Sequence, residues 1–350
     1  MAEENQTTHK RRVRYSGKYP KKFEEKYKEL QPEKYKDTIE HVIKKGNTPA
    51  GMHISIMVNE ILDFLKIQPG ETGFDATLGY GGHTKAMLQC LNGQGHIYAT
   101  DVDPEESART RKRLEEAGFG EDILTIRLQN FCTIDEIAKE AGGFDFILAD
   151  LGVSSMQIDN PKRGFSFKVD GPLDLRLNQE AGISAAERLD TITREELAGM
   201  LYENSDEPYC EELAKAITDE IRKGSRIDTT TKLREVIEKT LDFLPEKEKK
   251  DTIKKTCQRT FQALRIDVNR EFEVLYEFME KLPDALKPGG RVAILTFHSG
   301  EDKLVKKALK EGYRAGIYAD YSKDVVRPSA QECAQNGRAR STKMRWAVRA

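Results

Sequence analysis

The possible folds are limited most by one glycine-rich stretch, Phe74-Asp75-Ala76-Thr77-Leu78-Gly79-Tyr80-Gly81-Gly82-His83-Thr84. Its pattern predicts a strand, a glycine turn and a helix that begins near His83. Three glycines within four positions allow backbone angles that a Cβ forbids, and they let the backbone approach a ligand closely. In an α/β sheet, a turn of this kind after the first strand is where a nucleotide-like ligand binds. The spacing here is G-x-G-G rather than G-x-G-x-x-G, which argues against an ordinary NAD enzyme.

Strand and helix patterns alternate on both sides of this turn and predict an α/β fold with a doubly wound sheet. The strands expected from the apolar runs cover residues 73–77, 95–100, 123–128, 144–150 and 291–297, with 344–348 as a last edge strand. Residues 160–255 contain helical patterns and no convincing strand. One long helix is expected over residues 261–282, after this helical stretch.

The length of 350 residues favours one large domain with an insertion, or two domains. We expect a basic N-terminal arm (1–50), a first part of the α/β domain (51–159), an inserted helical subdomain for substrate recognition (160–255), and a second part of the α/β domain with a basic C-terminus (256–350). The helical insertion thus separates the fourth and fifth strands.

Charge is distributed unevenly along the chain, although the formal net charge is only −2. Residues 1–50 hold 13 Lys and Arg against 8 Asp and Glu, and residues 321–350 hold 7 against 2. Two basic ends around an acidic middle fit contact with a polyanion such as a nucleic acid. Solvated tails that keep the chain soluble explain the same pattern equally well.

The cysteine pattern argues against a zinc site and against a disulfide framework, because the five cysteines are scattered and form no C-x-x-C pair. We expect no bound metal. No apolar run approaches the roughly 18–20 residues that a membrane-spanning helix needs. The N-terminus is charged and has no apolar signal core. These features predict a soluble cytoplasmic protein.

Two residues after predicted strands are candidates for binding a nucleoside. Asp101 ends the second strand, where a carboxylate accepts hydrogen bonds from both ribose hydroxyls. Asp103 competes for this role, but it is better explained as the cap of the next helix. Phe131 follows the third strand, where an aromatic ring stacks on an adenine; a plain core phenylalanine is almost as good an interpretation.

Two further candidates follow the fourth and fifth strands. Asp150 is placed to accept a proton or a hydrogen bond from an amino group whose nitrogen attacks an electrophile. The alternative, that Asp150 caps the following helix, has equal weight on the residues alone. His298 either orients the substrate or is a hydrogen-bonded structural histidine. The sequence has no H-E-x-x-H, P-loop or G-x-S-x-G motif, so zinc hydrolysis, phosphoryl transfer and nucleophile-elbow chemistry have no support.

The motifs taken together resemble one family, the RsmH/MraW type of S-adenosylmethionine-dependent methyltransferase. The resemblance runs from about Met52 to the C-terminus and is carried by many motifs in the right order. These motifs are DATLGYGGH (75–83), DVDP (101–104), DLGVSSMQID (150–159), RGFSF (163–167), FQALRIDVN (261–269) and NGRARS (336–341).

This resemblance implies a class I (Rossmann-like) methyltransferase fold and methylation of the exocyclic N4 of a cytosine in the decoding region of small-subunit ribosomal RNA. The implied cofactor is S-adenosylmethionine, and its implied contacts are Gly81, Gly82, His83, Asp101, Phe131, Asp150 and Gln157. Asp150 is the implied catalytic residue. The implied partner is small-subunit ribosomal RNA, either alone or in an assembled 30S subunit.

The resemblance also suggests residues that contact the RNA. Phe165 or Phe167 is expected to hold the base that leaves its stack. Arg163, Arg176, the helical insertion and the basic C-terminus are expected to contact the RNA backbone.

The chain departs from the family pattern at positions that spare the expected cofactor site. It has Leu173-Asp174-Leu175-Arg176-Leu177 where the family usually has Leu-Asp-Met-Arg-Met, and Asn204-Ser205-Asp206-Glu207 replaces a Gly-Glu-Glu pattern. Gly300-Glu301-Asp302 stands where the family usually has Leu-Glu-Asp, and the arm of residues 1–50 is not part of the usual pattern.

Three alternatives remain open. The first is an aminomethyltransferase that acts on another RNA or on DNA. The second is a non-catalytic RNA-binding or ribosome-assembly factor that keeps a relict cofactor fold. The third, disfavoured by the glycine spacing, is an NAD-linked dehydrogenase.

Overall fold

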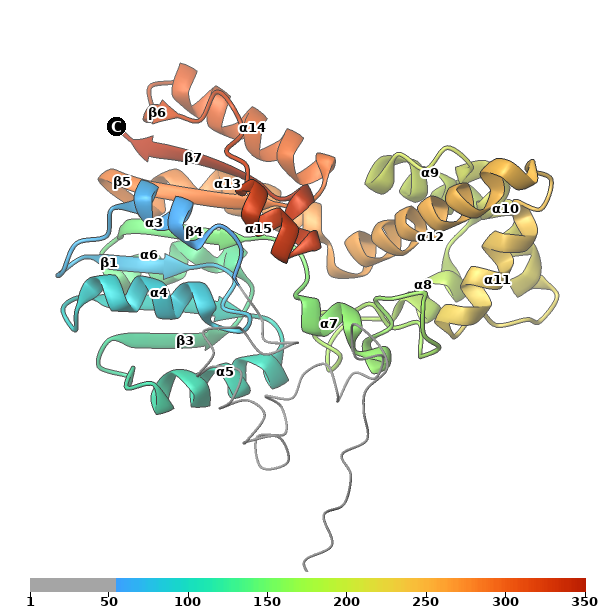
Figure 1. Cartoon of the computed structure of the whole chain (residues 1–350), viewed down its shortest axis with the longest axis horizontal. Helices are drawn as coiled ribbons and strands as arrows, with labels where there is room; N and C mark the ends of the chain where they lie inside the picture. The colour runs from blue at the N-terminus through green and yellow to red at the C-terminus, as the bar shows by residue number, and fades with distance from the viewer. Residues whose placement is uncertain (1–54) are drawn as a thin grey trace, which may run out of the picture. The chain divides into compact units, whose positions relative to one another are not determined.

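The computed structural model describes residues 55–350, and the predicted arm of residues 1–50 lies outside the described residues. The central element is a seven-stranded sheet in the order β3-β2-β1-β4-β5-β7-β6 (Figure 1). Its strands are β1 (Thr72–Asp75), β2 (His96–Asp101), β3 (Leu124–Leu128), β4 (Phe144–Asp150), β5 (Leu286–Thr296), β6 (Tyr318–Tyr321) and β7 (Lys343–Arg349). The order changes direction at β1, and the prediction of a doubly wound sheet is confirmed.

The first five strands are parallel, whereas β7 runs antiparallel to both of its neighbours. The C-terminal strand was expected at the edge of the sheet, and this expectation is wrong. β7 pairs with β5 from Arg291↔Val348 to Thr296↔Lys343, while β6 pairs with its other side and forms the edge. β6 has four residues, too few to show a strand period in the sequence.

Helices cover both faces of the sheet. The central strands have apolar side chains on each face, and both faces must be shielded from water. One face packs on α3 (Val58–Leu65), α4 (Gly82–Leu91) and α5 (Pro104–Glu116). The other packs on α6 (Ile134–Ala141), α13 (Glu271–Ala285) and α14 (Ser299–Arg314). In β4 the side chains alternate between these faces: Phe146 and Leu148 join the first core, and Ile147 and Ala149 join the second.

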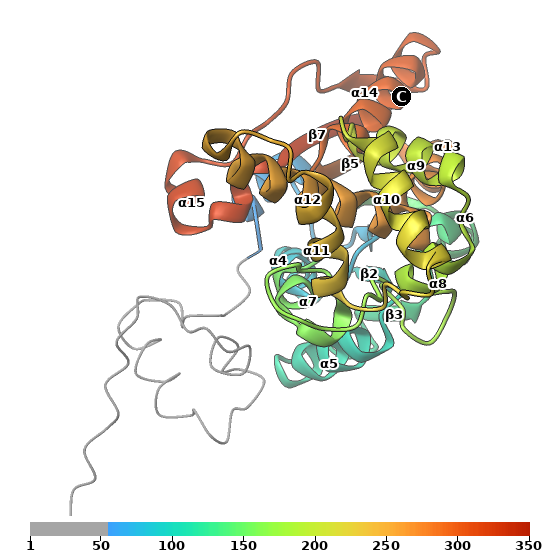
Figure 2. The ribbon, with the colours of Figure 1, turned by 90° about the vertical axis from the view of Figure 1, so that its right-hand side faces the viewer.

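The segment between β4 and β5 contains a helical part with its own apolar core. Its helices are α8 (Ala185–Thr191), α9 (Arg194–Ser205), α10 (Cys210–Arg222), α11 (Thr230–Thr240) and α12 (Glu246–Asn269). Figure 2 shows α10, α11 and α12 beside one another. Buried Leu197, Leu213, Ile237 and Leu264 represent this core, which is separate from the two cores on the sheet. We propose that the inserted part extends to Asn269, because residue 255 falls within α12.

The expectation of one long helix over residues 261–282 is wrong, since two helices meet there. Arg270 adopts a left-handed conformation, with a φ of 52°, and separates α12 from α13. Arginine carries no sequence signal for such a break, which glycine or asparagine would have given.

Shorter elements complete the chain: η2 (Phe131–Thr133), α7 (Ser155–Asp159), η3 (Pro161–Arg163), α15 (Ala330–Gln335) and η4 (Gly337–Ser341). No helix within residues 55–350 is long and apolar enough to cross a membrane.

Candidate active site

The glycine loop after β1 is held in place by backbone conformation and by one carboxylate. Gly79 and Gly81 have φ values of 46° and 81°, in the left-handed region that favours glycine. The Gly79 N–H donates to Oδ2 of Asp101 at 2.8 Å. A Cβ on Gly81 would lie 2.6 Å from Cγ2 of Thr110, so the loop has no room for a side chain there. The predicted strand, turn and helix are confirmed.

Asp101 stands at the end of β2 and accepts two backbone hydrogen bonds. Besides Gly79, the N–H of Asp103 donates to it at 2.9 Å. Burial raises the pKa of Asp101 to about 6, although these two N–H donors pull it down. Each carboxylate oxygen accepts only one of these bonds, so lone pairs remain for a ligand. Asp103 caps α5 by accepting from the N–H groups of Glu105 and Glu106, as predicted.

Asp150 ends β4 and has one oxygen without a partner. Its N–H donates to Oγ1 of Thr77 at 2.7 Å, and Oδ2 lies 3.4 Å from Nδ1 of His83. Oδ1 is buried and has no hydrogen-bond partner among the described residues. Burial raises the pKa of Asp150 to about 6; His83 opposes this shift, while Asp75 and Glu301 add to it. A buried acceptor without a donor is costly, and a bound N–H group would satisfy it.

His83 lies between Asp150 and the backbone of Ile56. Its Nε2 lies 2.9 Å from the carbonyl oxygen of Ile56, and since a carbonyl only accepts, Nε2 carries the hydrogen. Nδ1 then faces the Asp150 carboxyl group.

Ser154, rather than Asp150, caps the helix that follows β4. The Ser154 side chain accepts from the N–H of Gln157, and the Gln157 side chain accepts from the N–H of Ser154. The structure therefore excludes the helix-cap interpretation of Asp150. Nε2 of Gln157 also donates to Oδ2 of Asp103 at 3.1 Å.

Arg163 forms a buried ion pair that the sequence analysis missed. Its Nη1 donates to Oδ2 of Asp103 at 2.8 Å, and its Nη2 donates to the carbonyl oxygens of Arg176 and Leu177. The side chains of Arg163 and Asp103 are only 7% and 3% exposed. The expectation that Arg163 contacts RNA is therefore wrong. Asp103 and Arg163 lie 60 positions apart, and no local pattern connects them.

Arg176 is also engaged within the chain. Its Nε and Nη2 donate to the carboxylate of Asp174 at 2.9 and 2.8 Å, and its Nη1 donates to the carbonyl oxygen of Gly182 at 3.0 Å. The side chain is 17% exposed. Arg176 thus holds the loop before α8 together, in addition to any contact with a ligand.

A single cavity of about 520 Å³ collects all the predicted cofactor residues. A cavity of this size is within the range that holds a cofactor or drug-sized ligand. The predicted residues that line it are Gly81, Gly82, His83, Asp101, Phe131, Asp150 and Gln157. Residues of the segment between β4 and β5 line the same cavity, and they are Phe165, Phe167, Lys168, Phe261 and Arg265.

Aromatic side chains stand on two sides of this cavity. Phe131 begins η2 and packs edge-on against Phe278, with ring centroids 5.2 Å apart. Phe167 packs edge-on against Phe261 at 5.7 Å, and Phe165 is 9% exposed. The first pair belongs to the sheet edge and the second to the inserted segment, so flat ligands can be held on both sides.

The sheet topology, the glycine loop after β1 and the carboxylate after β2 define a Rossmann-like, class I methyltransferase that uses S-adenosylmethionine. The family model described as the MraW methylase family matches residues 50–350. The chain belongs to this family.

Curated relatives agree with this family. A relative named ribosomal RNA small subunit methyltransferase H 1, from Agathobacter rectalis, is 87% identical over the full length of both chains. A relative of the same name from Lachnoclostridium phytofermentans is 70% identical over 99% of this chain and 95% of its own. Among solved structures, a putative rRNA-methylase from Clostridium thermocellum has a TM-score of 0.39 at 12% identity, covering 85% of this chain and 98% of its own.

Proposed function

We propose that the chain transfers a methyl group to the exocyclic N4 of a cytosine in the decoding region of small-subunit ribosomal RNA. The observation that carries this proposal is the buried, unpartnered Oδ1 of Asp150 inside the cavity. An exocyclic amino group is a donor that fits such an acceptor. The printed names of the two curated relatives support a ribosomal RNA substrate. Such a substrate also favours action in the cytoplasm.

The residues that line the cavity suit a methyl donor that contains a nucleoside. Gly81, Gly82 and His83 would bind it at the first turn of α4, where the backbone leaves room for close approach. Asp101 would accept hydrogen bonds from the ribose hydroxyls, because the N–H groups of Gly79 and Asp103 occupy only one lone pair on each of its oxygens. Phe131 would pack on the adenine ring. When bound, S-adenosylmethionine supplies an electrophilic methyl group on a sulfonium.

Asp150 and Gln157 would lie beside the reacting end of the cavity, with different tasks. Asp150 would hydrogen-bond the amino group and aim its lone pair at the methyl group. Gln157 already binds Asp103 and the Ser154 N–H, so it fixes the loop after β4 against the start of α5. Phe165, Phe167 and Phe261 would hold the flat base after it leaves its stack.

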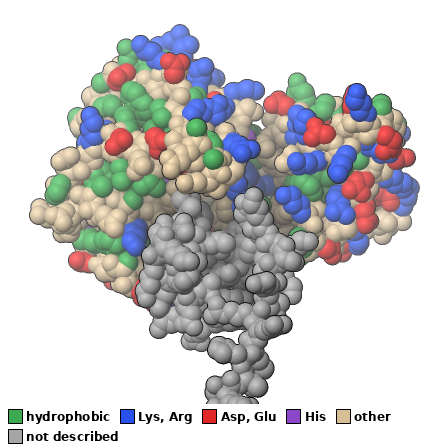
Figure 3. Space-filling view, in the orientation of Figure 1, with side chains coloured by type: hydrophobic (Ala, Val, Ile, Leu, Met, Phe, Trp, Pro, Cys, Tyr) green, Lys and Arg blue, Asp and Glu red, His purple; other side chains and the backbone are tan. Residues whose placement is uncertain are grey.

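Cations at the mouth of this cavity offer a path for the RNA backbone. Lys168 is exposed and lines both this cavity and a neighbouring groove. Lys250 and Lys254 line that groove, and neither forms an ion pair with a described residue. Figure 3 shows Lys and Arg side chains, interspersed with acidic ones, on the face of the helical part that it displays. Contacts of lysine with phosphates would supply affinity that depends on salt.

Mass spectrometry of ribosomal RNA tests the proposal. Small-subunit RNA from a strain that lacks the gene should contain no N4-methylcytidine at the decoding region, and the intact chain should restore it. Restoration by residues 51–350 alone would show that the arm of residues 1–50 is dispensable. If N4-methylcytidine persists in the deletion strain, the proposed target is wrong, and methylation of another RNA or of DNA becomes the better hypothesis.

Calorimetry separates the catalytic proposal from its non-catalytic alternative. A relict that only binds RNA need not bind S-adenosylmethionine, whereas the proposed enzyme must. Saturable binding that is lost in Asp101→Ala would support the proposed cofactor site.

A further inference from the structure

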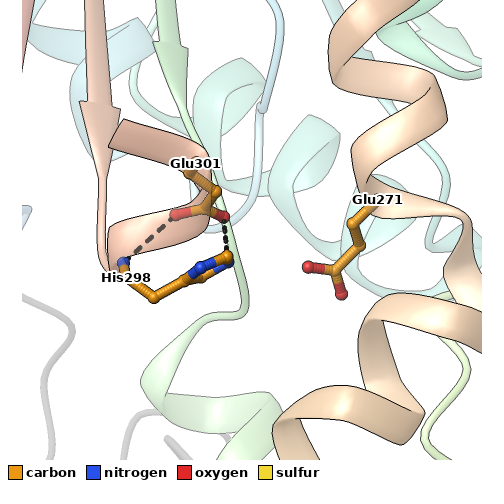
Figure 4. A group of neighbouring side chains, drawn as sticks. All are labelled: Glu271, His298 and Glu301. Atoms are coloured by element: carbon orange, nitrogen blue, oxygen red, sulfur yellow. Dashed lines mark hydrogen bonds and ion pairs between the residues drawn. The ribbon is translucent and has the colours of Figure 1, made fainter. Parts of the chain in front are cut away.

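One group of charged side chains in the cavity has no part in the proposed cofactor site. Glu271 at the start of α13, His298 before α14 and Glu301 in the first turn of α14 converge there (Figure 4). One ligand atom from each lies within 4.8 Å of the others. β5 lies next to β4, so His298 and Asp150 follow neighbouring parallel strands at the same edge of the sheet.

The His298 ring is enclosed, and its nitrogens are incompletely paired. Its side chain is 11% exposed, and Nε2 lies 3.2 Å from Oε1 of Glu301. Both ring nitrogens are buried, and neither makes a hydrogen bond within the described residues. Oε2 of Glu301 accepts from the N–H groups of Phe297 and His298, which fixes the carboxylate beside the ring. A structural histidine would be expected to have both nitrogens satisfied.

The charged groups around His298 are two acidic side chains and one compensated ion pair. Arg265 in α12 donates from Nε and Nη2 to Glu271 at 2.8 and 2.9 Å, so these two charges compensate each other. Glu301 and, from the end of β4, Asp150 add negative charge. Burial alone raises the pKa of Glu301, but the His298 ring and nearby N–H groups hold it below its ordinary value. A protonated His298 would neutralise the charge of Glu301.

A metal ion is a poorer occupant of this group than a proton. The spacing of the three ligand atoms would suit one ion. The guanidinium of Arg265, however, already binds both oxygens of Glu271 and would repel a cation beside them. This arrangement instead suits a histidine that changes its charge during the reaction.

We propose that His298, oriented by Glu301, accepts the proton that the target amine loses during methyl transfer. This inference rests on the proposed amine target. The amine nitrogen forms its bond to the methyl carbon as the carbon–sulfur bond of the donor breaks, and that electron pair stays on sulfur. The N–H bond breaks, its electron pair returns to nitrogen, and the proton passes to the imidazole of His298 and then to solvent. Removal of this proton offsets the weak nucleophilicity of an amino group conjugated with the base.

Asp150 is the less suitable acceptor, because its unpartnered Oδ1 is the oxygen proposed to hold and aim the amine, while Oδ2 faces Nδ1 of His83. The other ring nitrogen of His83, Nε2, lies 2.9 Å from the carbonyl oxygen of Ile56, so this ring is held in place beside Asp150. Asp150 aims the amine, and His298 removes its proton. From the sequence alone, His298 could either orient the substrate or be a structural histidine.

Gly300 gives the ring its position in this particular chain. A Cβ at Gly300 would lie 2.6 Å from Cζ of Phe272 and 3.2 Å from Nδ1 of His298. Phe272 uses this space to pack edge-on against the His298 ring, with centroids 5.7 Å apart. The departure from the usual Leu-Glu-Asp pattern therefore falls on the residue that sets the His298 environment.

Single-turnover methylation of small-subunit RNA with His298→Ala tests the proposal. The rate should fall by about 10²-fold, as for loss of a general base, while calorimetry shows unchanged affinity for S-adenosylmethionine. Added imidazole should restore the rate in proportion to its neutral form. His96→Gln is the matched control, because His96 binds Oγ1 of Thr125 outside the cavity; it should keep the wild-type rate.

A second variant guards against misfolding. Glu301→Gln keeps an oxygen for the Phe297 and His298 N–H groups but removes the charge, so it should fold and lose about 10-fold in rate without a change in KM. Unchanged rates in both variants would overturn the proposal. A folded but slow His298→Ala variant that imidazole does not rescue would also overturn it. So would wild-type activity that EDTA abolishes and Mg²⁺ restores, because this result would indicate a metal site. If the wild-type chain itself produces no N4-methylcytidine, the proposed function fails instead.

Discussion

The carboxyl edge of the sheet and the helical part from α8 to α12 use polar residues in opposite ways. At the sheet edge, the carboxyl groups of Asp101 and Asp150 are partly buried, their pKa values are raised, and one oxygen of Asp150 has no partner among the described residues. In the helical part, most charged side chains are exposed, and several pair over one helical turn, such as Lys232 with Asp228. Buried, incompletely satisfied polar groups cost stability and are typical of functional sites. The difference supports our proposal that the sheet edge performs the chemistry, while the helical part supplies aromatic walls and cations.

Breaking the buried ion pair at the sheet edge should have the largest effect. In Arg163→Met, Asp103 stays buried without its cation, so the free energy of unfolding should fall by about 3–5 kcal/mol in urea titrations. Arg188→Met is the matched change in the helical part, where the pair with Asp267 is about a quarter exposed; it should cost at most about 1 kcal/mol. Equal losses for the two variants would contradict the comparison.

Removing the charge of Asp150 should have the next largest effect, and on rate rather than stability. Asp150→Asn should slow single-turnover methylation by about 10²- to 10³-fold at pH 7.5, because the negative charge that strengthens the hydrogen bond from the amine is lost and the amide NH2 competes with its oxygen for this position. Asp145→Asn at the other end of β4 is its control. Asp145 binds Lys287 and the N–H of Thr72 outside the cavity, so the rate should stay near that of the wild type. An Asp150→Asn variant with full activity would exclude the assigned role.

Acid should weaken cofactor binding at the sheet edge. Asp101 has a folded-state pKa of about 6, so it is ionised at pH 7.5 and becomes protonated as the pH falls to 5. A neutral carboxyl group accepts hydrogen bonds more weakly, and the affinity for S-adenosylmethionine should fall about tenfold over this range. Calorimetry on Asp101→Asn should show weak binding with a smaller pH dependence. Wild-type affinity that is constant between pH 7.5 and pH 5 would argue against Asp101 as the ribose acceptor.

Removing a lysine from the inserted segment should have the smallest effect, and it should change RNA binding without changing cofactor binding. Lys168→Ala should weaken RNA binding about threefold and reduce the salt slope of the affinity by about 1, as expected for one lost phosphate contact. Lys112→Ala on α5 is a control, since Lys112 is exposed but lines neither cavity. A Lys168→Ala variant whose salt slope equals that of the wild type would remove this residue from the RNA path.

Local patterns were enough to predict the glycine loop, β4 and the cap at Asp103, because each depends on neighbours in the chain. The family resemblance supplied the seven expected cofactor residues, and all seven line one cavity, since parallel strand ends meet at the same edge of a sheet. The ligand contacts of these residues stay predictions, as does the division of the chain into four parts.

Long-range pairings were beyond the sequence. Arg163 looked like an RNA contact until its partner Asp103 was known, and the fork of Arg265 on Glu271 spans two helices that looked like one. The place of β7 inside the sheet depends on β6, whose four residues show no period. All three cases depend on contacts made in the folded chain, and a single sequence does not show them.

The separation of β4 from β5 has a consequence for how the chain is made. Asp150 pairs with Leu295, so more than a hundred residues must leave the ribosome before β4 acquires this neighbour. During that interval the apolar β4 carries an open hydrogen-bonding edge, which is a site for wrong pairing with other chains. The helical part has its own core and can compact first, which shortens the effective distance between the two strands. Destabilising the helical part should therefore lower the yield of folded protein more than its equilibrium stability.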